Sequence, residues 1–214
     1  MYVHKFNALD LNNKNEIYTI KPGATNVLFI GGCRSFAYSI FFEELCKFNS
    51  YLKNAQYGIS AIAVHIMEIC KRNKTPKLTH VIENADIIIC EQIRHYSMLN
   101  TSTECEQNIF NNFNIKPTCK IINVPNLECY YDNTPESKMQ NVARLTNHCE
   151  KYHFENLSKY IDVNATIIGS MFITHNHPSN ALFCQLMKEL IETHFEVIID
   201  SQLMTVMQRI RIFD

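Results

Sequence analysis

The chain has 214 residues, a formal net charge of −1 and 46% hydrophobic residues. A chain of this length buries roughly 70% of its unfolded surface, so it needs no disulfide to hold a core. The near-neutral charge, with no basic block in the sequence, gives no electrostatic signal for nucleic-acid binding, and none is expected. No apolar run is long enough for a membrane-spanning helix.

Nine cysteines are spread along the chain without a single Cys-x-x-Cys pair. This spacing argues against a structural metal site, and no metal is expected. It favours a reducing compartment in which thiols serve as small hydrophobic side chains, so the expected location is the cytoplasm. Frequent Asn and Ile, which have A- and T-rich codons, suggest an intracellular parasite or a large AT-rich virus as the source. If the source is viral, the expected location is the host cytoplasm.

Residues 1–24 are expected to form an irregular N-terminal edge segment. The apolar run Asn26 to Ile30 predicts a buried strand, which ends at Gly31-Gly32. Apolar residues recur every three to five positions over 35–48, which predicts a helix. A second helix is predicted from Ser60 to about Lys71.

Further patterns along the chain predict the remaining strands and helices. Two further apolar strands are predicted at 86–90 and 119–125, a helix at 103–113, helical structure over 138–160, 181–193 and 203–210, and a short strand or helix continuation at 195–199. Within the polar segment 138–160, His148 and His153 are expected to be solvated. Three apolar strands between helices predict a helix-rich α/β fold in three layers, a short central parallel sheet flanked by helices, in a single domain over 1–214.

The first candidate site is the turn from Gly31 to Ser35. A strand that enters a helix through two glycines presents backbone N–H groups at the helix N-terminus, where they bind anions or an oxyanion. The same position lowers the pKa of a thiol, which makes Cys33 a candidate nucleophile. Gly32 and Arg34 are then candidate oxyanion contacts, and Arg34 and Ser35 candidate cofactor contacts. The alternative is a tight turn with Cys33 packed inward.

The second candidate is the polar turn His175-Asn176-His177-Pro178 before a long amphipathic helix. Histidine titrates near neutrality and is the usual general base, so His177 and His175 are candidate catalytic residues. Pro178 is expected in the first turn of the helix, where its missing N–H does no harm. Side chains two apart in extended backbone point to opposite sides, which favours one working histidine over a shared metal. The alternative is that one histidine caps the helix and the other is solvated.

The third candidate is the rim where the strands end. Ligands of open parallel sheets bind outside the carboxyl ends of the strands. Gln92, Arg94 and Asn126 follow predicted strands, so we expect them beside the Gly31–Ser35 turn, with Asn176 and its neighbours completing the group. The alternative is that loops are polar in any case.

Four segments in order resemble a known family: FIGGCRSFAYSIFFEEL, NADIIICEQIRHY, INVPNLECYYDNTPE and FITHNHPSNALFCQLMKELIE. Over residues 26–192 they resemble the WcbI-like polysaccharide biosynthesis proteins, which look like divergent relatives of the SGNH hydrolases and acyltransferases. The resemblance implies coenzyme A binding and acetyl transfer to a sugar. It matches Cys33 to the family's cysteine, His177 to its late histidine and Gln92 to a polar residue after the second strand.

The chain departs from the family pattern at several positions. Gly32 and Arg34 stand where the family tends to have Asn and Gln. An SGNH-like protein would have Asp three residues before the working histidine, and here that residue is Thr174. A dyad, or a carboxylate such as Glu91, would have to take the place of the missing triad member.

The expected function is therefore an acetyl-CoA-dependent acetyltransferase acting on an amino or hydroxyl group of a sugar or nucleotide sugar. His177 would be the general base, Cys33 would accept the acetyl group or lie beside the thioester, and Arg34 and Arg94 would contact phosphates. Two alternatives stay open, an SGNH-type esterase or deacetylase and a non-catalytic module that binds coenzyme A or a sugar. A homodimer and a place in a longer multidomain protein also stay open.

Overall fold

The computed structural model describes residues 25–32, 34–48, 59–66, 69, 76–92, 110–129, 134–195 and 197–210. The chain divides into two compact units, Phe6–Asn123 and Val124–Asp214, the latter with Met1–Lys5. Each unit is described by itself. None of the helices in these ranges is long and apolar enough to cross a bilayer.

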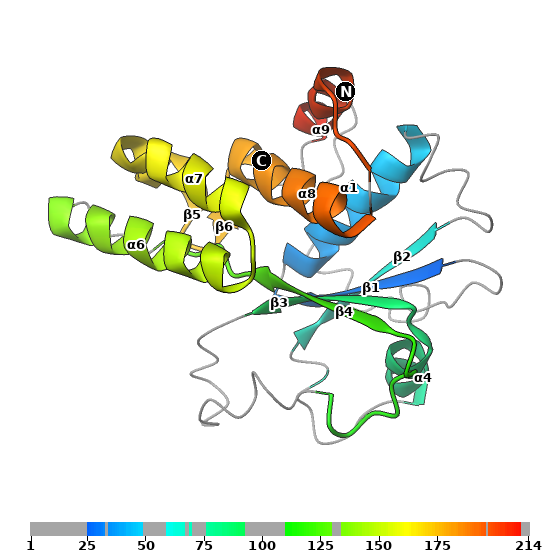
Figure 1. Cartoon of the computed structure of the whole chain (residues 1–214). Coiled ribbons are helices and arrows are strands. Elements are labelled where there is room, and N and C mark those ends of the chain that lie inside the picture. Colours follow the sequence, from blue (N-terminus) through cyan, green and yellow to red (C-terminus); the bar gives the residue numbers. More distant parts are fainter. Residues whose placement is uncertain are drawn as a thin grey trace. The chain divides into compact units, whose positions relative to one another are not determined.

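The first unit is built on a parallel sheet (Figure 1). Its four strands have the order β2-β1-β3-β4, with bounds β1 Thr25–Gly31, β2 Ile59–His65, β3 Ile87–Gln92 and β4 Lys120–Pro125. Strand β1 lies in the middle, where Val27 pairs with Ala61 on one side and with Ile87 on the other. The three strands predicted from apolar runs are confirmed, and the sheet contains a fourth.

The fourth strand, β2, corrects the first half of the helix predicted from Ser60 to Lys71. In the second half, the described residues Ile66 and Ile69 are helical. The segment Ile59–His65 is a strand that pairs along its whole length with β1. A short, continuous apolar run has no periodicity that separates a buried strand from a buried helix, and its pairing in the sheet decides the outcome. Ile62 and Val64 then share one face of the sheet and join its core.

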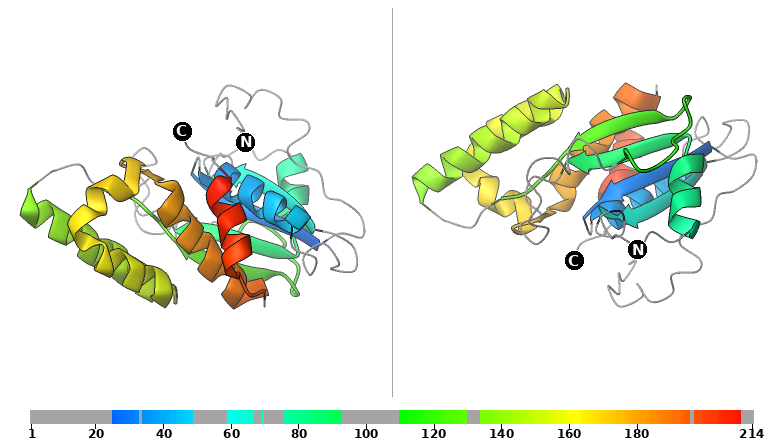
Figure 2. Two further views of the ribbon diagram at one scale, coloured as in Figure 1. Left: turned by 90° about the horizontal axis from the view of Figure 1, so that it is seen from above. Right: turned by 90° about the horizontal axis from the view of Figure 1, so that it is seen from below.

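Helices cover both faces of this sheet (Figures 1 and 2). On one face, α1 (Arg34–Phe48) brings the rings of Tyr38 and Phe42 against Phe29 of β1. On the other, α4 (Pro76–Asn84) packs Leu78, Val81 and Ile82 into a core with Leu28 and Ile30 of the same strand. Successive residues of a strand point to opposite faces, so one apolar run supplies both cores. The three-layer α/β arrangement is therefore confirmed for this unit.

The helix predicted over 103–113 falls largely outside the described residues. Its described end, Phe110–Phe113, is a turn closed by a hydrogen bond from the Phe113 N–H to the Phe110 carbonyl (2.9 Å). Phe110 and Phe113 pack against the core formed with α4. Here apolar residues three apart belong to a partly buried turn.

The second unit is mainly helical. Its elements are α6 Pro135–Lys151, α7 Glu155–Val163, the 3-10 helix η3 Ala165–Met171, β5 Phe172–Thr174, β6 His177–Pro178, α8 Asn180–Phe195 and α9 Ser201–Arg209. The helical structure predicted over 138–160 is confirmed but consists of two helices. They are separated at His153, whose φ of 63° is incompatible with a continuous helix. Helices α6 and α7 lie side by side (Figure 2).

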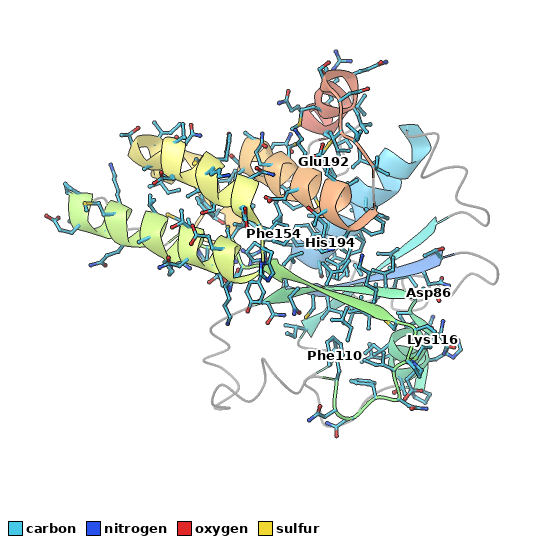
Figure 3. All side chains as sticks on the ribbon, in the orientation of Figure 1. Asp86, Phe110, Lys116, Phe154, Glu192 and His194 are labelled. Carbon is cyan, nitrogen blue, oxygen red and sulfur yellow. The ribbon has the colours of Figure 1, made fainter. Side chains whose placement is uncertain are left out.

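Buried and half-buried carboxylates of α8 hold the neighbouring segments in place. Glu189 is buried and accepts hydrogen bonds from the N–H groups of Asn156 and Leu157 (2.9 and 2.7 Å), so it caps the start of α7. Glu192 accepts the N–H of Ile199 (3.0 Å; Figure 3). Residues 197–200 have irregular backbone, so the prediction of a strand or helix continuation at 195–199 is wrong for 197–199. Phe195 does continue the helix as the last residue of α8, and residue 196 lies outside the described residues.

Candidate functional site

The hairpin formed by β5 and β6 in the second unit contains the polar motif of residues 175–178. Thr174 pairs with His177 across it, and Phe172 pairs with Pro178. Two further backbone bonds fix the hairpin, from Cys129 N–H to the His175 carbonyl (2.6 Å) and from Ser179 N–H to the Met171 carbonyl (2.7 Å). The polar motif predicted at residues 175–178 is therefore held at both its turn and its base.

Three side chains of this hairpin form a hydrogen-bonded chain. Thr174 Oγ1 lies 3.0 Å from Asn176 Oδ1 and 2.7 Å from His177 Nδ1. Since Asn176 Oδ1 can only accept, the single hydroxyl proton of Thr174 is donated to it. The Nδ1–H of His177 then donates to Thr174 Oγ1, which leaves the lone pair of the imidazole on Nε2. The arrangement thus orients the ring so that, in its neutral form, Nε2 is the nitrogen able to take a proton.

The two histidines of the motif differ in their surroundings. His175 is exposed at the turn, whereas His177 is half-buried and bonded to Thr174. Pro178 is buried in β6, which corrects its predicted place in the first helical turn. Helix α8 begins after Ser179, whose Oγ accepts the Leu182 N–H (3.4 Å), so serine performs the capping that the alternative interpretation gave to a histidine.

In the first unit, the turn after β1 is organised by a buried carboxylate. Glu91 Oε1 accepts from Arg34 Nε (2.6 Å) and from the Tyr38 hydroxyl (3.4 Å), and its Oε2 accepts the Gly32 N–H (3.1 Å). The side chains of Arg34 and Glu91 are 3% and 0% exposed. This buried ion pair joins β3 to the start of α1.

The same carboxylate explains why residue 31 is glycine. A Cβ at Gly31 would lie 2.6 Å from Glu91 Oε2 and 2.9 Å from Glu91 Cβ. Contacts this short exclude any side chain unless the carboxylate moves. The first glycine of the pair therefore makes room for an internal ion pair.

The polar groups that the sequence offered as ligand contacts at this turn have internal partners. Besides the Gly32 N–H and Arg34, the fully buried Ser35 donates its hydroxyl to the Gly32 carbonyl (2.8 Å). Their roles as oxyanion or cofactor contacts stay predictions. Cys33 and Arg94 lie outside the described residues.

The other rim residues are also bonded within their own units. Gln92 Nε2 donates to Asn123 Oδ1 (2.9 Å) in the first unit. In the second, Asn126 is buried and its N–H donates to Nδ1 of His148 (3.1 Å). The joint rim of these residues with the hairpin stays a prediction.

His148 corrects one expectation and His153 confirms another. His153 is exposed, as expected for a solvated side chain. His148 is only 2% exposed, and its ring lies edge-on to that of Tyr152, with centroids 5.0 Å apart. Its position in a polar helix hid a buried face, because α6 packs that face against the rest of the unit.

Burial makes most of the described thiols unreactive. Desolvation raises the pKa of Cys90, Cys149 and Cys184 to about 12, and nearby carboxylates add to the effect for the first two. The described residues also contain no group of three His, Cys, Asp or Glu side chains placed to hold a metal ion. The prediction of structural thiols is confirmed for these three.

A further carboxylate that the sequence did not single out lies at the opposite ends of the same strands. Asp86 accepts from Lys116 Nζ (2.9 Å; Figure 3) and from the Asn26 N–H (2.8 Å). Partial burial raises the pKa of Asp86, but the bonds from Lys116 and Asn26 outweigh that effect and leave the pKa below its usual value. No local pattern marks these three residues, because they come from segments far apart in the sequence and meet only in the folded chain.

Comparison with models of known protein families gives no match for the chain, and comparison with curated proteins gives none either.

Proposed function

We propose that the protein is an acetyl-CoA-dependent acetyltransferase that acts on an amino or hydroxyl group of a sugar or nucleotide sugar, with His177 as its general base. The observation that carries this proposal is the chain Asn176–Thr174–His177. It supplies what the missing triad carboxylate would supply first, a fixed ring orientation with Nε2 as the basic nitrogen. The resemblance to the WcbI-like proteins supplies the substrate class.

In this mechanism the acceptor hydroxyl or amine attacks the thioester carbonyl carbon while His177 Nε2 removes its proton. The carbon–sulfur bond breaks, and the coenzyme A thiolate leaves with the proton returned by the imidazolium. Thr174 is neutral, so it orients the ring without stabilising the imidazolium as a carboxylate would. If Cys33 is acetylated first, the same histidine activates the acceptor in the second step.

A second candidate is a carbohydrate esterase or deacetylase that uses the same histidine. The observation that favours it is the burial of Arg34, whose Nε is bonded to Glu91 and which is only 2% exposed. Of the two arginines expected to bind phosphates, this leaves the contact with coenzyme A to Arg94. A hydrolase takes water as the acceptor and needs no such contact.

The experiment compares wild type, His177→Gln and the matched control His175→Gln. Each is incubated with acetyl-CoA and a panel of amino sugars, and separately with p-nitrophenyl acetate alone. Acetyl transfer that is lost in His177→Gln and kept in His175→Gln supports the transferase. Hydrolysis without transfer, with the same dependence on His177, supports the esterase. Activity that survives in His177→Gln, or an inactive wild type that still binds coenzyme A, rules out the assigned chemistry.

A further inference from the structure

The helical hairpin of the second unit carries a hollow on its surface. A cavity of about 580 Å³ lies where the first half of α6 meets the end of α7 and the start of η3. Its lining is largely aliphatic and includes Met139, Val142 and Ala165. We call this surface, residues 135–146 with 162–167, the α6–α7 face.

A large apolar side chain projects from this hollow, since Met139 lines it and is 73% exposed. Val163 and Ile167, each the next residue in the chain after a lining residue, are 83% and 53% exposed. A hollow and exposed aliphatic side chains on one surface are typical of an interaction site. The face therefore has both an exposed apolar side chain and a hollow that can hold one.

Two opposite charges flank the hollow, each at an unfavourable end of its helix. Lys138 is the fourth residue of α6, near the positive end of that helix dipole, and Asp162 is the next-to-last residue of α7, near a negative end. In the part of the chain that the structure describes, neither residue forms an ion pair. Each charge would be stabilised by an opposite charge brought from outside.

We propose that the α6–α7 face binds the same face of a second copy of the chain about a two-fold axis. A two-fold contact joins residue i to j and j to i, so Lys138 of each copy meets Asp162 of the other. One positive and one negative charge on the same face satisfy this condition. The exposed Met139 of each copy then enters the hollow of the other, which is the self-complementary shape that such an interface requires.

The first test measures the mass of the full chain by analytical ultracentrifugation over a range of concentrations. We expect a dimer that Met139→Glu weakens about a hundredfold or more, because it buries an unpaired charge in both halves of the interface. Ile198→Glu is the matched control, since Ile198 is 85% exposed in the same unit but lies outside the face. A monomeric wild type, or a dimer that both substitutions affect equally, overturns the proposal.

The second test reverses the charges. Lys138→Glu and Asp162→Lys should each weaken self-association, by about tenfold for two exposed pairs. An equimolar mixture of the two variants should form a heterodimer, because each copy then presents the charge that the other lacks. Charges that interact only within one copy, or a face that binds a small apolar ligand, would give no gain on mixing and would overturn the proposal.

Discussion

Two short polar segments, Gly31–Ser35 and Thr174–His177, are candidate sites on sequence grounds. The first joins β1 to α1, and the second is the turn that joins β5 to β6, shortly before α8. In the first, Arg34 is bonded to a buried carboxylate and Ser35 to the turn's own backbone. In the second, hydrogen bonds between side chains orient a half-buried histidine. Burial therefore distinguishes a polar turn whose described side chains are bonded within the fold from one that holds a half-buried histidine, and we propose that only the second presents a reactive group. The predictions below test that distinction.

The largest effect is expected at the buried ion pair. Glu91→Ala leaves the Arg34 guanidinium, 2% exposed, without its carboxylate partner, and should lower the free energy of unfolding by about 3–5 kcal/mol. Chemical denaturation followed by circular dichroism measures this loss. The double variant Arg34→Met, Glu91→Leu should recover most of it, because an apolar pair avoids the unpaired charge. A small loss in Glu91→Ala would mean that the turn is solvated and open to ligands.

The next effect is expected at the glycine beside that carboxylate. Gly31→Ala places a Cβ 2.6 Å from Glu91 Oε2 and should cost about 1–3 kcal/mol of stability through forced displacement of the ion pair. Gly169→Ala is the matched control, since nothing lies within 4 Å of its added Cβ. Thermal unfolding of the two variants compares them directly. Equal stabilities would show that the carboxylate moves freely and that Gly31 is not needed for packing.

Sequence patterns predicted three strands and most of the helices. Apolar residues at helical spacing mark the buried side of a helix, and short continuous apolar runs mark buried strands. They misread Ile59–His65, where only the pairing with β1 distinguishes a strand from a helix. At the sites, the motifs located His177 but not its partner, because the pattern sought a carboxylate at position 174 and the structure uses a hydroxyl. Glu91 was named only as a substitute for that carboxylate, and its bond to Arg34, 57 residues away, has no local signal.

The hairpin is tested by changing the hydroxyl that orients His177. Thr174→Val keeps the shape of the side chain but removes the hydrogen bond to Nδ1, and should lower the proposed activity by about tenfold to a hundredfold. Thr174→Ser retains the hydroxyl and should retain most activity. Nitrogen-15 NMR of the His177 ring gives an independent measurement, in which wild type and Thr174→Ser carry the proton on Nδ1. An unchanged ring tautomer in Thr174→Val would show that threonine does not orient the histidine.

The smallest effect is expected at Asp86, the half-buried counterpart of Glu91. Its pKa is lowered in the folded state, so the unfolded chain binds more protons as the pH falls, and the stabilisation present above its ordinary value is lost toward lower pH. Asp86 and Lys116 are 37% and 34% exposed, so screening limits the contribution to less than about 1 kcal/mol. Urea denaturation at pH 7 and pH 3 should therefore show a small stability gap between wild type and Asp86→Asn that closes in acid. A gap as large as that of Glu91→Ala would mean that burial does not set the energetic difference between the two carboxylates, since both are paired with a cation and differ chiefly in exposure.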